Sequence, residues 1–414
     1  MPTRIRRTST DYRHPYRPGP VKLLNRFLRS ADLSMERLLA DACRKEKRDD
    51  FGDPSFEAPL ARLLDAIENE AALTPFGRIA TRARLVNILR NRLRAERLFR
   101  ETPEILETPL PPVLLITGLQ RTGTTLLHRL LAADPDTRSL AAWEALNPAP
   151  FPLPTHKDRA ARIRTAVRSQ KILARLAPDF FAIHPAHAES PEEDVLLLDY
   201  AFVSTVPESI LEVPSYATWV EAADHRPAYR YMKKLLQLLH HQTPKKRWIL
   251  KSPHHLEFLD TFFETFPDAK VVHTHRDPLV TLPSFCSMIC HSRGIFSDRV
   301  DPERVGAHWL RKTARMLDRG RRFSAGLPAG CQLDIEYEAF IQDPMADVRR
   351  IYEMLDVPLR EGVVADMEAV RQSNPQHRFG VHVYDMADFG LTEEAIVSAY
   401  EPEAVSSKQE VCRS

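Results

Sequence analysis

Apolar residues recur at helical spacing through the first quarter of the chain. One apolar stripe follows Asp53-Pro54, which has the form of an N-cap with proline at the first helical position. The segment 78–106 repeats the helical period and is rich in arginine. We therefore expect an α-helical N-terminal region over residues 21–108, preceded by a mobile basic arm over residues 1–20.

From residue 109 onward, short apolar runs alternate with helical segments. Strands that alternate with helices in this way favour a parallel sheet flanked by helices. We expect this α/β domain to cover residues 109–400, with a helical insertion at about 158–242 and a tail over 401–414. The strand candidates are the run in PLPPVLLITG, Trp248–Leu250, Lys270–His275 and Cys331–Ile335, and the helices between them include Leu256–Phe266 and Asp343–Leu355.

The composition is that of an ordinary globular protein, with 43% hydrophobic and 28% charged residues. This balance excludes a disordered or fibrous protein. The formal net charge of +2 disfavours a nucleic-acid binder, which would carry a basic excess. The five cysteines form no CxxC pair, and no apolar run approaches the roughly 20 residues of a membrane span. We therefore expect a cytoplasmic protein with no zinc site, no nucleic-acid partner and no membrane span.

The segment Gly118–Thr125, GLQRTGTT, lies between a predicted strand and a predicted helix. Its glycine spacing matches the GxxxxG of a phosphate-binding P-loop, in which backbone N–H groups and a helix N-terminus face an anion. Thr124 replaces the lysine of that motif, and the cation stands three positions earlier, at Arg121. The sequence therefore predicts an anion-binding loop, but the missing lysine weakens the interpretation as a nucleoside triphosphatase.

This loop resembles the 5′-phosphosulfate-binding loop of the sulfotransferases, in which a lysine or arginine precedes [ST]-G-[ST]-T. The resemblance implies a P-loop-like, three-layer α/β fold. It also implies 3′-phosphoadenosine 5′-phosphosulfate (PAPS) as the donor co-substrate, 3′-phosphoadenosine 5′-phosphate (PAP) as the product, and no metal. The donor-binding residues that it implies in this loop are Gly118, Arg121, Thr122, Gly123, Thr124 and Thr125.

A second segment, VVHTHRDPLVTLPS, agrees with this resemblance. Arg276 at a predicted strand end and Ser284 eight positions later are similar to the family's 3′-phosphate site in residue type and separation. Arginine supplies a bidentate fork for a phosphate, and a serine inside the following helix adds a neutral donor. The structural alternative for Arg276-Asp277-Pro278 is a turn with an internal salt bridge.

Further segments resemble the family in order and spacing. WILKSPHHL places Lys251 at a predicted strand end, and DIEYE, followed by Asp343-Pro344, precedes a late helix. His377–Gly380 and Asp388–Leu391 resemble the large bacterial branch, whereas the glycine-rich C-terminal motif of the cytosolic branch is missing from the sequence. The resemblance is thus to bacterial sulfotransferases related to the tyrosylprotein and carbohydrate enzymes.

The resemblance also assigns catalytic roles. It gives Arg121 and Lys251 the task of stabilising the leaving 5′-phosphate. Two candidates remain for the base that takes the acceptor proton, Glu144 after the loop helix and His255 near Lys251. The acidic run at 192–194, EED, fits either acceptor binding or the acidic first turn of a helix.

We therefore predict a sulfotransferase that moves a sulfuryl group from PAPS to a hydroxyl or amine by in-line displacement. Its acceptor is an unidentified small molecule, glycan or lipid, and a homo-oligomer is possible. Two alternatives stay open. One is a small-molecule P-loop kinase, which would need the missing loop lysine, and the other is a non-catalytic protein that binds PAP or another nucleotide.

Overall fold

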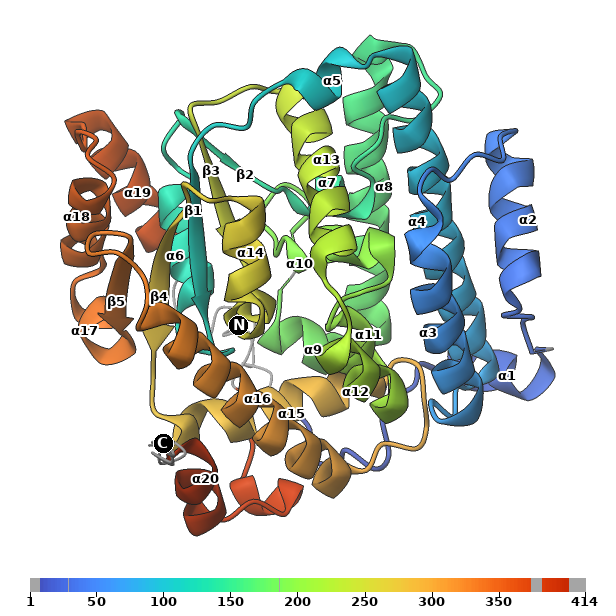
Figure 1. Ribbon diagram of the computed structural model, residues 1–414. Coiled ribbons are helices and arrows are strands. Elements are labelled where there is room, and N and C mark those ends of the chain that lie inside the picture. The colour runs from blue at the N-terminus through green and yellow to red at the C-terminus, as the bar shows by residue number, and fades with distance from the viewer. Residues whose placement is uncertain (1–7, 29, 186, 374–381, 402–414) are drawn as a thin grey trace, which may run out of the picture.

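A five-stranded parallel sheet lies at the centre of the molecule (Figure 1). The computed structural model describes residues 8–28, 30–185, 187–373 and 382–401. The strand order is β2-β3-β1-β4-β5, and every neighbouring pair is parallel. The predicted parallel α/β sheet flanked by helices is confirmed. The strands are β1 (Val113–Gly118), β2 (Thr137–Ser139), β3 (Arg247–Lys251), β4 (Lys270–His275) and β5 (Gln332–Glu336).

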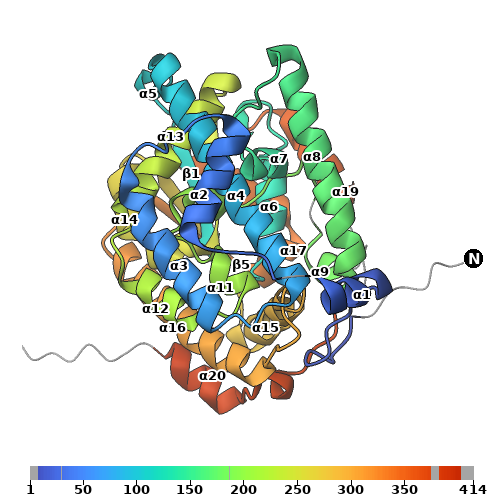
Figure 2. The same ribbon diagram turned by 90° about the vertical axis from the view of Figure 1, so that its right-hand side faces the viewer.

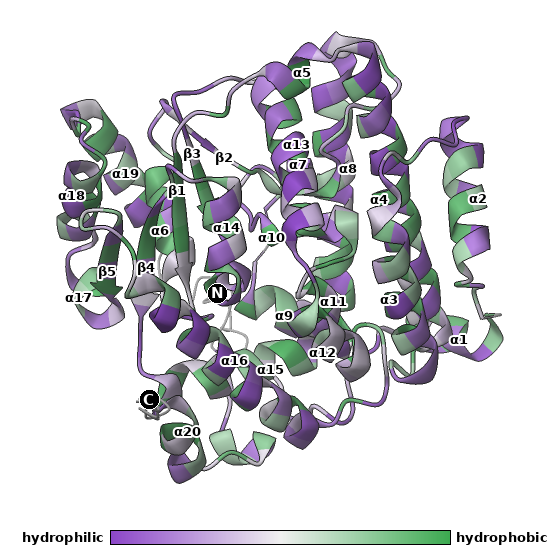
Figure 3. Ribbon diagram, viewed as in Figure 1, coloured by the Kyte–Doolittle hydropathy of each residue, from purple (hydrophilic) through white to green (hydrophobic). Residues whose placement is uncertain are grey.

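Helices cover both faces of the sheet, because its strands bury side chains on both sides. On β1, Leu114 and Ile116 pack toward one group of helices, and Val113 and Leu115 pack toward the other. Figure 3 shows hydrophobic residues gathered on β1 and β3. The first group is α6 (Thr124–Leu131), α18 (Pro344–Met354) and α19 (Glu361–Ser373), and the second includes α13 (Arg226–Gln242), α14 (Leu259–Thr265) and α16 (Pro302–Ser324).

The N-terminal helices pack on the same hydrophobic core as the sheet, because Leu89 belongs to one contiguous cluster with Trp248 of β3. The buried guanidinium of Arg92 fastens this region further by donating hydrogen bonds to the carbonyl oxygens of Phe51 and Tyr200. The boundary between the N-terminal region and the α/β domain stays a prediction. The elements here are α1 (Gly19–Phe27), α2 (Met35–Glu46), η1 (Pro54–Phe56), α3 (Glu57–Asn69), α4 (Pro75–Glu101) and α5 (Glu104–Glu107) (Figure 2).

A series of helices separates β2 from β3, where the sequence predicts a helical insertion. Strand β2 itself was not predicted, because its three residues, Thr-Arg-Ser, carry no apolar pattern, and its pairing with Arg247–Ile249 fixes it as an edge strand. The elements between the two strands are α7 (Ala142–Leu146), α8 (Thr155–Leu176), α9 (Pro178–Ile183), α10 (Val195–Leu198), η2 (Asp199–Ala201), α11 (Val206–Ile210), α12 (Pro214–Ala222) and α13.

Near the C-terminus, the segment around Phe389 packs against α16. A Cβ atom on Gly306 of α16 would lie 2.1 Å from the carbonyl oxygen of Phe389, so this glycine lets the two segments pack closely. The motif His377–Gly380 lies outside the described residues, as do the first seven residues of the predicted arm and residues 402–414 of the predicted tail. The remaining elements are η3 (Pro253–Glu257), α15 (Pro278–Arg293), α17 (Tyr337–Gln342), η4 (Met386–Phe389) and α20 (Glu393–Tyr400).

None of the helices in the described part of the chain combines the length and the apolar character that crossing a membrane requires.

Candidate active site

The loop between β1 and α6 has the backbone geometry of an anion-binding turn. Gly118, Arg121 and Gly123 have positive φ angles of 143°, 71° and 87°. A Cβ atom on Gly118 would lie 2.4 Å from the carbonyl oxygen of Thr274, so only glycine fits beside β4. Left-handed residues in such a turn direct successive N–H groups to one side, and the N-terminus of α6 adds a partial positive charge. The loop can therefore hold a phosphate or sulfate group.

Two arginines and a serine meet beside this loop. Arg121 donates from Nε to Ser284 Oγ at 3.2 Å, and Arg276 donates from Nη1 to the carbonyl oxygen of Arg121 at 3.0 Å. The Arg276 guanidinium stacks on the ring of Tyr337, with its Cζ 3.8 Å from the ring centroid. Its Nε lies 3.9 Å from the carboxylate of the exposed Glu338. The structure thus brings together three residues that the sequence places in two separate motifs.

The guanidinium of Arg121 is partly buried and has no carboxylate partner among the described residues. Burial lowers the pKa of Arg121, and the neighbouring charge of Arg276 also lowers it. Within the described residues, no carboxylate forms an ion pair with Arg121. A buried cation without a counter-charge is costly for the folded protein, so it is typical of a site that binds an anion.

Lys251 lies at the end of β3, beside the strand that leads into the loop. It pairs with Ile116 in the parallel register, and its Nζ forms an ion pair with Glu193 Oε1 at 2.7 Å. The backbone N–H of Lys251 donates to Asp194 Oδ1, also at 2.7 Å. Two carboxylates of the acidic run at 192–194 therefore contact Lys251, one at its side chain and one at its backbone. These contacts favour a role of the run in the site over that of a simple helix start.

A cavity of about 280 Å³ lies between the β1–α6 loop and the acidic run, and Lys251, Arg276 and Ser284 are not among its lining residues. Its walls come from the β1–α6 loop, α9, α10, α11, η3 and α15. Among its polar lining residues are Gln120, Arg121, Thr124, Thr125, His184, Glu192, Glu193, Ser252 and His254. The predicted loop residues Arg121, Thr124 and Thr125 thus face the same space as Glu193, the partner of Lys251.

Glu144, a predicted base, does not join this group. Both of its carboxylate oxygens accept hydrogen bonds from Arg138, at 2.9 and 2.6 Å, and one also accepts from the N–H of Ala141. Its side chain lines a different cavity, of about 920 Å³, beside Arg138 and Trp143. Because its oxygens are engaged within the protein and it faces away from the loop, this placement argues against Glu144 as the base.

His255 and Thr122 also point into the protein. His255 is fully buried, with Nδ1 2.7 Å from the hydroxyl of Tyr229 and Nε2 2.5 Å from Asp194 Oδ2. Both ring nitrogens are therefore occupied, which argues against proton transfer from an acceptor to this histidine. Thr122 donates from its hydroxyl to the carbonyl oxygen of Leu119 at 2.6 Å, so it holds the loop rather than a ligand through its side chain.

Two further residues belong to the site, although neither was predicted as a base. Glu193 lines the cavity and contacts Lys251, and the only signal in the sequence was the acidic run that contains it. His184 lines the same cavity, and burial lowers its pKa against the opposing influence of Glu192 and Glu193. A lone histidine in a helical insertion carries no recognisable pattern, so only the fold could place it here.

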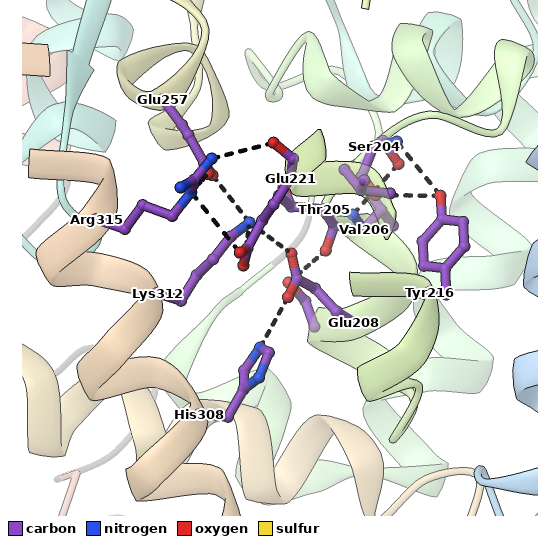
Figure 4. Close-up of polar contacts among 12 residues, drawn as sticks. Ser204, Thr205, Val206, Glu208, Tyr216, Glu221, Glu257, His308, Lys312 and Arg315 are labelled. Atoms are coloured by element: carbon purple, nitrogen blue, oxygen red, sulfur yellow. Dashed lines mark hydrogen bonds and ion pairs between the residues drawn. The ribbon is translucent and has the colours of Figure 1, made fainter. Parts of the chain in front are cut away.

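A second cluster of charged side chains, centred on the buried Lys312, connects two walls of the cavity to a neighbouring helix. Figure 4 shows the contacts within this cluster. Lys312 Nζ lies 3.6 Å from Glu208 Oε1, 3.2 Å from Glu221 Oε1 and 2.9 Å from Glu257 Oε2. Burial by itself would lower the pKa of Lys312, but the three carboxylates raise it. Glu208 belongs to α11 and Glu257 to η3, so this network ties two walls of the cavity to α16.

One group among the described residues has the arrangement of possible metal ligands. His273, His275 and Asp334 each offer one ligand atom, and these atoms lie within 4.8 Å of one another on β4 and β5. Two of them are in direct contact, since His275 Nε2 lies 2.6 Å from Asp334 Oδ1. That the protein works without a metal stays a prediction.

Comparison with known proteins identifies relatives of one kind. The model of the sulfotransferase family matches residues 112–361. An omega-hydroxy-beta-dihydromenaquinone-9 sulfotransferase, Stf3, from Mycobacterium bovis and its counterpart from Mycobacterium tuberculosis are each 27% identical over 260 residues, which cover 59% of this chain and 62% of the relative. The chain thus spans about three fifths of the length of these curated relatives.

Two crystal structures are similar over most of the chain. The sulfotransferase STF1 from Mycobacterium tuberculosis superposes with a TM-score of 0.74 at 31% identity, over 89% of this chain and 98% of that structure. The sulfotransferase STF9 from Mycobacterium avium superposes with a TM-score of 0.80 at 28% identity, over 89% of this chain and 95% of that structure.

Proposed function

Because this chain belongs to the sulfotransferase family, we propose that it transfers a sulfuryl group from PAPS to a hydroxyl group of an acceptor. The observation that carries this proposal is the partly buried charge of Arg121, which lies next to Arg276 at a turn suited to an anion and has no carboxylate partner among the described residues. PAPS has an anionic group at each end of its ribose, so it suits a site with two such arginines. The family match and the missing loop lysine speak against the kinase alternative.

Donor binding is divided between the two arginine-containing motifs in this proposal. The N–H groups of the loop, with the hydroxyls of Thr124 and Thr125, bind the 5′-phosphosulfate, which explains why both threonines line the cavity. Arg276 and Ser284 bind the 3′-phosphate. The Nε of Arg276 supports this assignment, because it is buried and has no hydrogen-bond partner among the described residues.

The transfer forms a bond between the acceptor oxygen and sulfur and breaks the bond between sulfur and the 5′-phosphate oxygen, in line. Lys251 and Arg121 stabilise the negative charge on the leaving phosphate. Glu193 takes the proton of the acceptor hydroxyl, since it is the carboxylate that both lines the cavity and contacts Lys251. Asp194 and His255 act as positioning residues, because Asp194 accepts a hydrogen bond from the backbone N–H of Lys251 and His255 in turn holds the Asp194 carboxylate.

We propose a hydroxylated small molecule or lipid as the acceptor. The name of the relative from Mycobacterium bovis gives omega-hydroxy-beta-dihydromenaquinone-9 as its substrate, which supports this class. A cytoplasmic location and a homo-oligomeric state stay predictions from the sequence.

The test of donor identity uses the 3′-phosphate, a group that ADP lacks. Truncating an arginine that pairs with a phosphate in a partly desolvated groove costs about 2–4 kcal/mol. Arg276→Ala should therefore weaken the PAP complex by roughly 30- to 700-fold. ADP affinity should barely change, because ADP never uses that contact. Paired calorimetric titrations of PAP and ADP on the parent and on Arg276→Ala measure both quantities, and equal affinities for PAP and ADP in the parent would overturn the proposal.

A further inference from the structure

A second cavity, of about 640 Å³, adjoins the candidate active site. Its walls include residues of α4, α7, α8 and α10, and α4 and α8 lie side by side in both ribbon views (Figures 1 and 2). Glu192 and Leu196 line this cavity and also the cavity that contains Arg121. The volume lies within the range of about 300–1,000 Å³ that is usual for ligand pockets.

Several polar groups around this second cavity are paired within the protein, whereas the buried Nδ2 of Asn147 has no hydrogen-bond partner among the described residues. Arg84 forms an ion pair with Asp199, and the hydroxyl of Tyr200 donates to the carbonyl oxygen of Ala145 at 2.9 Å. Such groups have little capacity left for a ligand, so the surface offered to an occupant is mainly apolar. The apolar lining residues are Ile88, Ala142, Ala145, Leu146, Ala166, Leu173, Ala188, Leu196 and Phe296.

We infer that this cavity holds the apolar part of the acceptor, so that the substrate is an alcohol with a long or bulky apolar skeleton. The hydroxyl end then lies at the junction of the two cavities, next to Glu193, and the skeleton extends past Leu196 between α4 and α8. This inference rests on the proposed function, because the transfer chemistry determines where the hydroxyl lies.

A glycan does not suit this cavity. The many hydroxyls of a sugar would each need a hydrogen-bond partner once removed from water, because a buried polar group that is left unpaired weakens binding. The paired side chains Arg84, Asp199 and Tyr200 do not offer such partners, and the remaining polar lining groups, Asn147 among them, are few beside the apolar ones. Of the three acceptor classes that the sequence allows, the cavity therefore favours the apolar one.

The cavity also gives the N-terminal helices a role in acceptor choice. Ile88 belongs to α4, which lies outside the matched residues 112–361, and Leu173 belongs to α8 in the helical insertion. The loop and the arginines that face the donor come from other parts of the chain. Acceptor selection and donor binding are therefore carried by different segments, and a change in one can leave the other intact.

The experiment compares primary alcohols of increasing chain length as acceptors. With PAPS as donor, kcat/KM for butan-1-ol, hexan-1-ol, octan-1-ol and decan-1-ol is measured from the release of PAP. Burying one methylene contributes about 0.8 kcal/mol, which is a gain of up to about fourfold per methylene. We expect kcat/KM to rise at least about 100-fold from butan-1-ol to decan-1-ol, and glucose to be no better than butan-1-ol.

Two tryptophan variants on α8 locate the binding site. Ser169 lines the cavity, and Ser169→Trp should fill part of it. Ala160 is an exposed small residue nine positions earlier, which at about 100° per residue puts it on the opposite side of the helix. Ser169→Trp should lower the ratio of decan-1-ol to butan-1-ol in kcat/KM at least about tenfold and leave PAP affinity unchanged. Ala160→Trp should keep the parental ratio.

Binding measured without turnover separates this inference from the proposed function. Calorimetric titration of decan-1-ol into the PAP-bound parent and both variants needs no reaction. If the alcohol binds and Ser169→Trp alone weakens it, the inference holds even where transfer fails, and only the proposed function falls. If transfer occurs but shows no dependence on chain length, or Ser169→Trp leaves the ratio unchanged, the inference is overturned while the proposed function stands.

Discussion

The charged groups near the two ends of η3 differ in whether their cations have carboxylate partners. At the end of η3, Glu257 and two other carboxylates surround Lys312 (Figure 4). At its start, Pro253 faces the cavity that contains Arg121, which has no carboxylate partner among the described residues. The carboxylates raise the pKa of Lys312, whereas burial lowers that of Arg121.

This difference distinguishes a structural charge from a charge that binds a ligand. A buried cation with its counter-charges inside the protein contributes to one fixed arrangement of helices. A buried cation without them leaves a favourable position for an external anion. Loss of contact with water does not by itself separate the two cases, because it acts to lower the pKa of the fully buried Lys312 and also that of the partly buried Arg121. For Lys312 and Arg121, the number of carboxylates within reach separates them.

The largest expected effect on stability comes from removing the charge of Lys312 from its cluster with three carboxylates. Lys312→Met should lower the free energy of unfolding by about 3–5 kcal/mol, because it leaves three buried carboxylates without their shared cation. Arg121→Met is the matched variant and should change that free energy by less than about 1 kcal/mol while weakening PAP binding at least about tenfold. Urea unfolding and PAP titration of both variants measure these effects. Similar losses of stability in the two would abolish the distinction.

A second comparison concerns two carboxylate–cation pairs, Glu193–Lys251 in the cavity and Glu144–Arg138 outside it. Glu193→Gln should lower kcat by roughly 10²–10⁴ and keep PAP affinity within a few-fold, because it removes the base but not the donor contacts. Glu144→Gln should leave kcat within a few-fold and reduce stability, since the buried Arg138 loses its bidentate partner. Steady-state kinetics with unfolding curves distinguish them, and the reverse result would restore Glu144 as the base.

The smallest effect is a pH dependence that sharpens the first comparison. Burial opposes ionisation of Glu221, but hydrogen bonds from Arg311 and the charge of Lys312 lower its pKa to about 2, from an ordinary value of 4.5. Its contribution to stability is therefore present above about pH 4.5 and lost as the pH falls toward 2. In Lys312→Met the carboxylates lose this support, so protonation relieves their repulsion.

The difference in unfolding free energy between parent and Lys312→Met should then shrink as the pH falls from 7 to 4. Urea unfolding at pH 7, 5.5 and 4 measures this difference, and other titrating groups cancel because both proteins contain them. A difference that stays constant with pH would show that Lys312 acts through packing rather than through its charge.

Local chemistry in the sequence was sufficient to predict the anion-binding loop. The order of glycines, Arg121 and threonines between a strand and a helix identified the anion-binding turn and, through resemblance, the sulfotransferase family, which is confirmed. The spacing of Arg276 and Ser284 belongs to the same class of local signal. Both motifs are short and continuous, and parallel strands deliver their C-terminal ends to one edge of the sheet, so the chain order itself predicts that they meet.

The proposed proton acceptor and the proposed acceptor cavity depend on contacts between distant segments. Glu193 and Lys251 are 58 residues apart, and the cavity wall joins α4 to α8 and α10. The prediction of Glu144 as a base did not take into account its hydrogen bonds with Arg138, which lies six residues earlier on β2. That strand is too short to leave a recognisable sequence pattern.

The sequence by itself therefore determined the fold class, the family and the anion-binding loop, because backbone geometry and residue type act over a few neighbouring positions. Only the tertiary structure decided which carboxylate contacts Lys251, which charges neutralise one another and where a largely apolar cavity lies. These depend on helix packing, and the hydrophobic pattern of a helix indicates that it packs but not which polar side chains its partner will bring.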